Sequence, residues 1–484
     1  MNLNKMNIDR RKLVKLAGAS LATAGLGSAL GVIGGCGDGA SEPPAPAPTK
    51  GVMGKNGKRV LPWSNWSGLQ RCQPSLRVAP ADEAELAQMI GQSKQAIRFV
   101  GSGHSFNALV PTDQTLMSLA RLRGIESIDK PAKQVNVWAG TTLAELGEPL
   151  WKDGLSIANM PDIDRQALAG AIATSTHGAG ESFGSLSSMV TGMRLVNAEG
   201  EVIECSADKN SDLFNAARTS MGTLGAVSQI KMQLTDALKL KRRQWIMPFE
   251  EALERVDELR ADNRNFEFFA LPHTDYVFAI VHNETDEDPN IENRYSEEDS
   301  YETFRMMSEV YDWVPGFMRH RLGNMAARTV EPETEIGRAF EIFSNTRDIR
   351  NNEMEYSLPA ELAPACIREM MDTIRKENIN IVFPIEYRYA KADNIWLSPF
   401  YQRTTCSISV HQFIDRDHRP YFDRMETILR KYEGRPHPGK LHSLSHKELS
   451  LLYPRFNDFL RIRKEMDPQG KFLNDFVSKL LGVV

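Results

Sequence analysis

The sequence predicts an α+β fold in two parts, and three observations lead to that prediction. Short apolar segments separated by glycine-bearing or polar turns recur over residues 63–238, a pattern typical of β-strands. Amphipathic stretches with helix-capping residues lie between them. From residue 239 the chain mixes helical and strand stretches and contains less glycine. We therefore expect a first domain over 63–238 and an α+β domain over 239–484, in a chain of 484 residues that is long enough for a sizeable core.

The first 62 residues predict a targeting segment followed by a spacer. Arg10-Arg11-Lys12-Leu13-Val14-Lys15 is a twin-arginine box, and a weakly apolar run rich in glycine and alanine follows it. Such a run is a poor membrane helix, so a cleaved signal over 1–36 and export by the twin-arginine route are expected. Cys36 ends a stretch that resembles a lipobox, so the product is either periplasmic or tethered to the membrane by a lipid. Cys36 can equally be a chance cysteine. Residues 37–62 form a linker rich in proline and alanine.

Charge and cysteine content exclude several classes of partner. The net charge is −5, and the first 35 residues carry five basic residues and one acid, so the remainder carries −9. This argues against nucleic acid or an anionic membrane surface as the main partner. The cysteines after residue 36 show neither CxxC pairing nor the spacing of metal ligands, which predicts no disulfide framework and no metal site.

The individual elements of the first domain follow from local signals. Asp82 precedes a helical stretch with acidic residues in its first turn, which suits the helix dipole. Glu199-Gly200 separates two apolar runs and predicts a hairpin turn. The expected helices are 83–90, 143–152 with Thr142 as its cap, and 213–221; the expected strands lie within 63–77 and at 97–100, 116–119, 135–139 and 226–234, with the hairpin at 193–203.

Two glycine-bearing loops are the main candidates for a ligand site. Gly101 and Gly103 follow a short apolar strand, and their backbone N–H groups can form a concave nest for an anion such as a pyrophosphate. Thr174 and Thr176 add hydroxyl donors in the second stretch, 169–180. Phe106 stands where a dinucleotide fingerprint has its third glycine, so neither loop is of that type. A single Gly-Ser-Gly is usually a plain turn, but each of these two loops also carries a histidine.

The second half contains polar residues arranged to act together. Glu386 and Arg388 are two residues apart in an expected strand, so they project from the same face, either as a surface ion pair or as part of a site. A second expected strand, 406–411, delivers His411. Residues 283–300 are acidic without calcium-loop spacing, which favours a solvated loop. Helices are expected at 301–310 and 360–377.

These motifs resemble a known family. Gly-Ser-Gly-His-Ser-Phe at 101–106 and Thr-Ser-Thr-His-Gly-Ala-Gly at 174–180 resemble the FAD-binding domain of vanillyl-alcohol-oxidase-type (PCMH-type) flavoproteins, most closely the branch of sugar-1,4-lactone (D-arabinono- and L-gulono-lactone) and alditol oxidases. The resemblance implies a two-part FAD-binding domain, then a substrate (cap) domain whose C-terminal segment returns to the flavin. It also implies that His104 carries the FAD covalently. The cofactor-binding residues it predicts are Gly101, Ser102, Gly103, His104, Ser105, Gly170, Thr174, Thr176, His177 and Gly178, with Gly222 and Gly225 as weaker candidates in a turn that can equally be a plain helix end.

The resemblance also assigns the chemistry. Lys440 matches the lysine of a His-Trp-Gly-Lys-type motif, in which Pro438 replaces the usual tryptophan. The implied activity is oxidation of a hydroxyl-bearing carbon by hydride transfer to the flavin, with oxygen or an electron-transport component as acceptor. Glu386, Arg388, Lys440 and His411 are the predicted catalytic residues, and the identity of the base stays open among His411, Glu386 and an alkoxide stabilised by Lys440 and Arg388. Two alternatives are the same flavin fold acting on an unrelated alcohol, amine or aromatic substrate, and a lipid-tethered binding protein without catalysis.

Overall fold

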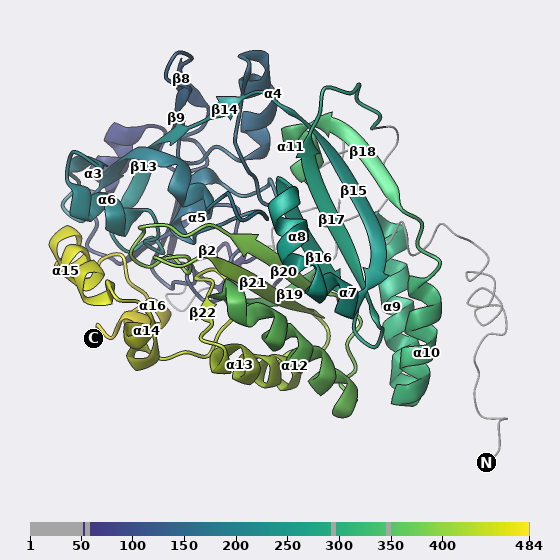
Figure 1. Ribbon diagram of the computed structural model, residues 1–484. Helices are drawn as coiled ribbons and strands as arrows, with labels where there is room; N and C mark the ends of the chain where they lie inside the picture. Colours follow the sequence, from purple (N-terminus) through teal and green to yellow (C-terminus); the bar gives the residue numbers. More distant parts are fainter. Residues whose placement is uncertain (1–51, 54–58, 292–296, 345–349, 484) are drawn as a thin grey trace.

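The computed structural model describes residues 52–53, 59–291, 297–344 and 350–483 (Figure 1). The predicted signal segment, Cys36 and most of the predicted linker lie outside these residues. None of the helices in the described part combines the length and the apolar character that a membrane crossing requires.

The first part of the chain contains two main sheets. A three-stranded parallel sheet has the order β5-β7-β6, and a five-stranded antiparallel sheet has the order β12-β11-β13-β9-β8. The strands are β1 (Val52–Met53), β2 (Arg59–Val60), β3 (Trp63–Ser64), β4 (Arg71–Cys72), β5 (Leu76–Val78), β6 (Ile97–Val100), β7 (Thr115–Ser118), β8 (Ile125–Asp129), β9 (Gln134–Trp138), β10 (Leu155–Ser156), β11 (Val190–Val196), β12 (Val202–Ser206), β13 (Ala226–Gln233) and β14 (Thr235–Asp236). The helices are α3 (Glu83–Gln92), α4 (Ala144–Lys152), α5 (Leu168–Ala173), α6 (Ser211–Ala217) and the 3-10 turn η2 (Leu186–Met189).

The second part is built on one antiparallel sheet of eight strands in the order β18-β15-β17-β16-β20-β21-β19-β22. Its strands are β15 (Lys239–Pro248), β16 (Asn265–Ala270), β17 (Tyr276–Glu284), β18 (Glu333–Arg338), β19 (Asn351–Pro359), β20 (Ile385–Ala390), β21 (Thr405–Phe413) and β22 (Arg435–Pro436). The helices of this part are α7 (Phe249–Glu254), α8 (Val256–Asp262), α9 (Glu297–Trp313), α10 (Gly316–Ala327), α11 (Ala339–Phe343), η3 (Ala360–Leu362), α12 (Ala363–Lys376), α13 (Arg419–Lys431), α14 (His446–Leu452), α15 (Phe456–Met466) and α16 (Asp475–Leu481).

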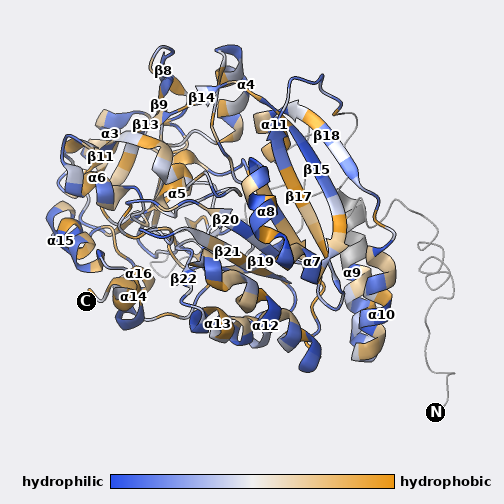
Figure 2. Ribbon diagram, in the orientation of Figure 1, coloured by the Kyte–Doolittle hydropathy of each residue, from blue (hydrophilic) through white to orange (hydrophobic). Residues whose placement is uncertain are grey.

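The two faces of this sheet differ in chemistry because side chains alternate along each strand. On β19, Met354 and Tyr356 point to one face and Glu353 and Glu355 to the other, and all four are buried. Helices α7, α8, α12 and α13 pack against strands of the sheet (Figure 1). Figure 2 shows hydrophilic and hydrophobic residues side by side on α12 and α13, as expected for helices with one face in solvent.

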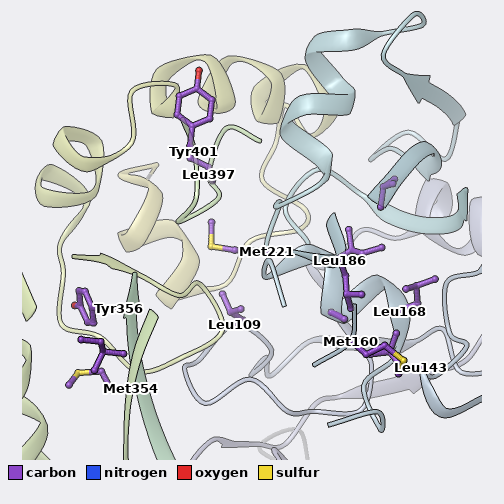
Figure 3. Packing of buried hydrophobic residues seen from close by; sticks show 14 of the residues in the cluster. Leu109, Leu143, Met160, Leu168, Leu186, Met221, Met354, Tyr356, Leu397 and Tyr401 are labelled. Atoms are coloured by element: carbon purple, nitrogen blue, oxygen red, sulfur yellow. The ribbon is translucent and has the colours of Figure 1, made fainter. Parts of the chain in front are cut away.

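The larger of two apolar clusters in the described residues crosses between the two parts. Figure 3 shows members of this cluster from the first part, such as Leu143 and Leu168, and others from the second, such as Met354 and Tyr356. The C-terminal segment contributes to the junction, because the Ile97 N–H donates to the carbonyl of Lys471 at 2.8 Å. Strand β6, which leads into the first glycine loop, is therefore held by the last residues of the chain.

Most predicted elements of the first part are confirmed. Strand β6 has the predicted limits, and the β11–β12 hairpin turns at Gly200, whose φ is +87°. Helix α3 begins after Asp82, whose side chain accepts a hydrogen bond from the Glu85 N–H at 2.8 Å. The domain boundary near residue 238 stays a prediction, although every strand of the eight-stranded sheet comes from residue 239 onward.

Four local predictions were wrong in detail. Thr142 does not cap α4 with its hydroxyl; instead its N–H donates to Glu145 Oε2 at 2.9 Å. Helix α6 ends at Ala217 rather than at residue 221, because the chain leaves the helix in a turn at 218–219 that leads to a left-handed conformation at Met221, where φ is +53°. The second glycine stretch begins with helix α5, so Gly170 is helical. The segment 283–300 is not one loop, since β17 extends to Glu284 and α9 starts at residue 297.

Candidate active site

A cavity of about 1460 Å³ lies where the first glycine loop, helix α5 and the turn before residue 440 meet. Of the residues predicted to bind the cofactor, those in its wall are Gly101, Ser102, Gly103, His104, Ser105, Gly170, Thr174, Gly222 and Gly225. Of the four predicted catalytic residues, Lys440 lines it. Most of the cofactor-binding residues predicted from the sequence therefore surround one cavity.

The first loop presents bare main chain to this cavity. Among the described residues, the backbone N–H groups of Gly101 to Ser105 have no hydrogen-bond acceptor. The carbonyl of Gly103 instead accepts from the Trp66 N–H at 2.8 Å, and the carbonyl of Ser105 accepts from Asn65 Nδ2 at 2.9 Å. Gly103 has φ +74°, a conformation that side chains disfavour. A nest of free N–H groups beside a large cavity fits a pyrophosphate such as that of FAD.

His104 stands in the same cavity wall as Lys440. Its ring stacks on Trp66, with the ring centroids 5.5 Å apart and the planes 29° apart. Burial, with a smaller contribution from the Lys440 ammonium, lowers the pKa of His104 to about 4, while Glu353 acts weakly in the opposite direction. The imidazole is therefore neutral near pH 7, and a ring nitrogen keeps a free lone pair.

The third glycine turn is held by a buried arginine. Arg98, on β6, donates from Nη2 to the carbonyl of Met221 at 2.9 Å and from Nη1 to the carbonyl of Gly222 at 3.2 Å. Gly225 has φ +133°, and a Cβ there would lie 2.3 Å from the Val196 carbonyl oxygen. This turn is thus fixed against the strand that carries the first loop, a contact that sequence reasoning missed.

Thr176, His177 and Gly178 lie outside the cavity wall. Thr176 Oγ1 is buried without a hydrogen-bond partner in the described chain. A Cβ at Gly178 would lie 2.2 Å from the Met160 carbonyl oxygen, so close packing requires glycine there. His177 places Nδ1 2.9 Å from the Gly178 carbonyl and Nε2 2.7 Å from Glu355 Oε1. Contact of these three residues with a cofactor stays a prediction. Through Glu355, His177 is joined to strand β19 of the eight-stranded sheet.

Glu386 and Arg388 form a buried ion pair, so the surface alternative is excluded. Glu386 is 2% exposed and Arg388 7%, and Arg388 Nη1 lies 3.3 Å from Glu386 Oε1. Arg388 Nη2 also donates to Glu355 Oε2 at 3.1 Å, and Ser409 Oγ donates to the same oxygen at 2.9 Å. Although burial alone lowers it, the carboxylates of Glu386 and Glu355 raise the pKa of Arg388. Burial raises the pKa of Glu355, but His177 and Arg388 outweigh this and hold it well below its usual range.

Lys440 lies at the end of a turn fastened to the first loop. Asn107 Nδ2 donates to the carbonyl of Pro438 at 2.6 Å and to that of Lys440 at 3.1 Å, and the Phe106 N–H donates to the Gly439 carbonyl at 2.7 Å. The Lys440 ammonium pairs with Glu353 and lies 4.9 Å from the centre of the Phe106 ring. Pro438 therefore helps to hold this turn through its backbone carbonyl, which a residue of any type can supply.

His411 completes the polar face. It lies opposite Glu353 in the β19–β21 register, is 5% exposed, and has Nε2 3.6 Å from Glu353 Oε1. Nε2 has no hydrogen-bond partner within the described residues. Glu353, Glu386 and His411 each bring one potential ligand atom within 4.8 Å of the others, although Lys440 already supplies a cation against Glu353.

Two carboxylates that sequence reasoning missed contact three of the four predicted catalytic residues. Glu353 connects Lys440 with His411, and Glu355 connects Arg388 with His177. Glu386, Arg388 and His411 do not belong to the cavity wall; they lie on the sheet next to Lys440, which does. The alternation of Glu353, Met354, Glu355 and Tyr356 was the available signal, because two acids at a spacing of two in a strand share one face.

Comparisons with known proteins give this site a family. A family model described as D-arabinono-1,4-lactone oxidase matches residues 230–480, and one described as FAD binding domain matches 74–206. An L-gulono-1,4-lactone dehydrogenase from Mycobacterium tuberculosis is 35% identical over 427 residues, covering 87% of this chain and 99% of the relative. An alditol oxidase from Streptomyces is 27% identical over 423 residues, covering 86% and 98%.

The fold is also found among solved structures. A cholesterol oxidase from B. sterolicum superposes with a TM-score of 0.71 at 15% identity and covers 87% of this chain and 96% of that chain. The flavin-type cradle of free N–H groups, the long matches to both family models and the 35% identical relative agree. The chain therefore belongs to the D-arabinono-1,4-lactone oxidase family, with an FAD-binding domain before the lactone oxidase region.

Proposed function

We propose that this protein is an FAD-dependent oxidoreductase that oxidises a hydroxyl-bearing carbon of a sugar-1,4-lactone or a polyol. The observation that carries the proposal is the buried polar face of the eight-stranded sheet beside the cofactor cavity, where Arg388 pairs with Glu386 and Glu355, and Glu353 pairs with Lys440. FAD, when bound, supplies the acceptor for the hydride. A ligand with several hydroxyl groups suits this face, because fixed donors and acceptors alternate over a short distance.

Each residue has a role that its contacts support. Arg388 is held by two carboxylates, so its guanidinium is fixed and can donate to a substrate oxygen that gains negative charge. Glu386 accepts hydrogen bonds from hydroxyl groups of the substrate. Lys440, in the cavity wall, supplies positive charge on the cofactor side. These roles depend on fixed positions, which burial and pairing provide.

We propose His411 as the group that takes the hydroxyl proton. Its Nε2 is buried without a hydrogen-bond partner in the described chain, so it is free to accept. The oxygen of Glu386 that faces Arg388 is already engaged by a guanidinium. Nε2 lies 3.6 Å from Glu353 Oε1, so the ring is positioned within the polar face.

Covalent attachment of FAD to His104 is part of the proposal. The neutral imidazole in the cavity wall supports it, since attachment requires a nitrogen lone pair. We also propose export by the twin-arginine route, supported by the box at 10–15, and lipid attachment at Cys36. Cell fractionation of the full chain and of Cys36→Ala tests the anchor: membrane association that survives the substitution contradicts it.

The experiment that tests the function is a substrate panel on the purified, FAD-loaded protein. Aldonolactones, alditols and aldoses are each offered with oxygen and with an artificial dye as acceptor. Bleaching of the flavin absorbance by a lactone or a polyol, followed by turnover with either acceptor, is expected. A colourless protein that takes up no FAD, or a flavin that only unrelated alcohols, amines or aromatics reduce, refutes the proposal.

A further inference from the structure

We infer that Glu353 balances the charge of Lys440 beside the cofactor cavity and so sets how electron-poor the bound flavin is; this inference rests on the proposed function. Glu353 is 4% exposed, lies on β19, and pairs through Oε2 with the Lys440 ammonium.

The main chain holds Lys440 independently of this ion pair. The Leu441 N–H donates to the backbone carbonyl of Glu353 at 3.0 Å, and the His437 N–H donates to the carbonyl of Glu355 at 3.0 Å. The carbonyl of Lys440 itself accepts from Asn107 Nδ2 at 3.1 Å. The turn is therefore fastened on both sides of the lysine, and removing the charge of Glu353 leaves these backbone contacts of the turn in place.

Glu353 is ionised, as charge balance requires. Burial alone raises its pKa, and Glu355 adds to that, but the Lys440 ammonium acts most strongly in the opposite direction, and the pKa lies below its usual range. Lys440 lines the cavity together with His104, and Lys440 and Glu353 act on the pKa of His104 in opposite directions. The charge at this wall of the cavity is thus the difference between the two groups.

The sign of the charge left unbalanced near the cavity determines the effect on the cofactor. A neutral residue at 353 leaves the positive charge of Lys440 unbalanced, and an unbalanced cation favours any negative charge gained by the flavin. A purely structural ion pair predicts something different: lower stability with an unchanged flavin. A property of the flavin, rather than the activity of the enzyme, therefore distinguishes the charge-balancing role of Glu353 from a purely structural one.

Glu353→Gln keeps the shape and removes the charge, and sulfite is the probe because its addition to a flavin places negative charge on the ring. The dissociation constant for sulfite, read from the loss of flavin absorbance, is expected to fall by about tenfold, with a rise in the flavin reduction potential. Glu353→Asp keeps the charge, is expected to stay within about twofold of the unmodified protein, and serves as the folded comparison if the Gln variant does not fold.

The matched control is Glu335→Gln. Glu335 pairs with the buried Arg242 between β15 and β18 of the same sheet, so the control loses a largely buried ion pair with no contact to the cavity wall. Its sulfite affinity is expected to be unchanged. Unchanged or weaker sulfite binding in Glu353→Gln, or an equal effect of Glu335→Gln, overturns the inference. Failure of the unmodified protein to hold FAD or to oxidise a lactone or polyol instead refutes the proposed function, which the substrate panel detects separately.

Discussion

Replacing Arg388 by methionine should lower the free energy of unfolding strongly. The contacts of Arg388 indicate which carboxylate is responsible. Without Arg388, Glu355 keeps His177 at 2.7 Å and Ser409 at 2.9 Å. Glu386, which is 2% exposed, loses the one ion-pair partner that the described structure gives it. Breaking a buried pair by removing one member costs about 3–5 kcal/mol, because a buried charge remains uncompensated.

The part of the loss that comes from Glu355 should depend on pH in a direction that linkage fixes. Arg388 lowers the pKa of Glu355 in the folded state, so its stabilisation is present above the unfolded carboxyl pKa of about 4.3 and is lost as pH falls below it. The difference between the two proteins should therefore stay constant from about pH 8 to pH 6 and narrow at about pH 4.

Urea denaturation of both proteins at equal flavin content measures this difference. Arg388→Met combined with Glu386→Gln provides the internal control, because it removes the orphaned charge as well. The free energy of unfolding of the double variant should exceed that of Arg388→Met alone by about 1 kcal/mol or more. The reasoning is refuted if Arg388→Met costs less than about 1 kcal/mol, or if the second substitution recovers nothing.

Three further predictions test other parts of the structure. His104→Ala should release its flavin on acid precipitation, whereas the unmodified protein should keep its colour in the pellet; equal retention contradicts the covalent link. Gly103→Ala should lower both flavin content and stability, by about 1–2 kcal/mol in a denaturant titration, because φ is +74° there, and unchanged flavin content contradicts the nest. In protein lacking residues 1–36, a thiol reagent should react first with the partly exposed Cys72, since burial raises the pKa of Cys205 to about 12. Early loss of a second thiol in the folded state would argue against that; the cysteines expected to stay protected are Cys205, Cys366 and Cys406.

Local sequence determined those features whose cause lies within a few residues. Strand β6 and the glycine loop after it follow from four residues of a buried strand and from a backbone conformation at Gly103 that glycine adopts readily. The cap at Asp82 and the hairpin turn at Gly200 have the same short range. The shared face of Glu386 and Arg388 follows from the period of two in a strand.

Where local signals failed, a distant contact decided. Thr142 forms an isolated β-bridge with Ala167, and α4 begins one residue later, after Leu143. The end of α6 at Ala217 and the positive φ of Met221 belong to a turn whose carbonyls Arg98 holds from 123 residues away. Propensity within a window of residues carries no information about such a partner.

The charge network of the active site was decided by tertiary structure alone. Antiparallel register sets His411 opposite Glu353 and Ser409 opposite Glu355, and the turn before Leu441 brings Lys440 to the same strand. A sequence shows which residues can be ionised, but the partners and the burial that keep them charged depend on strands brought together from residues 351–441. For this reason the sequence by itself indicated the glycine loop and four polar candidates, while the contacts of Glu353 with Lys440 and His411, and of Glu355 with Arg388, became visible only in the folded sheet.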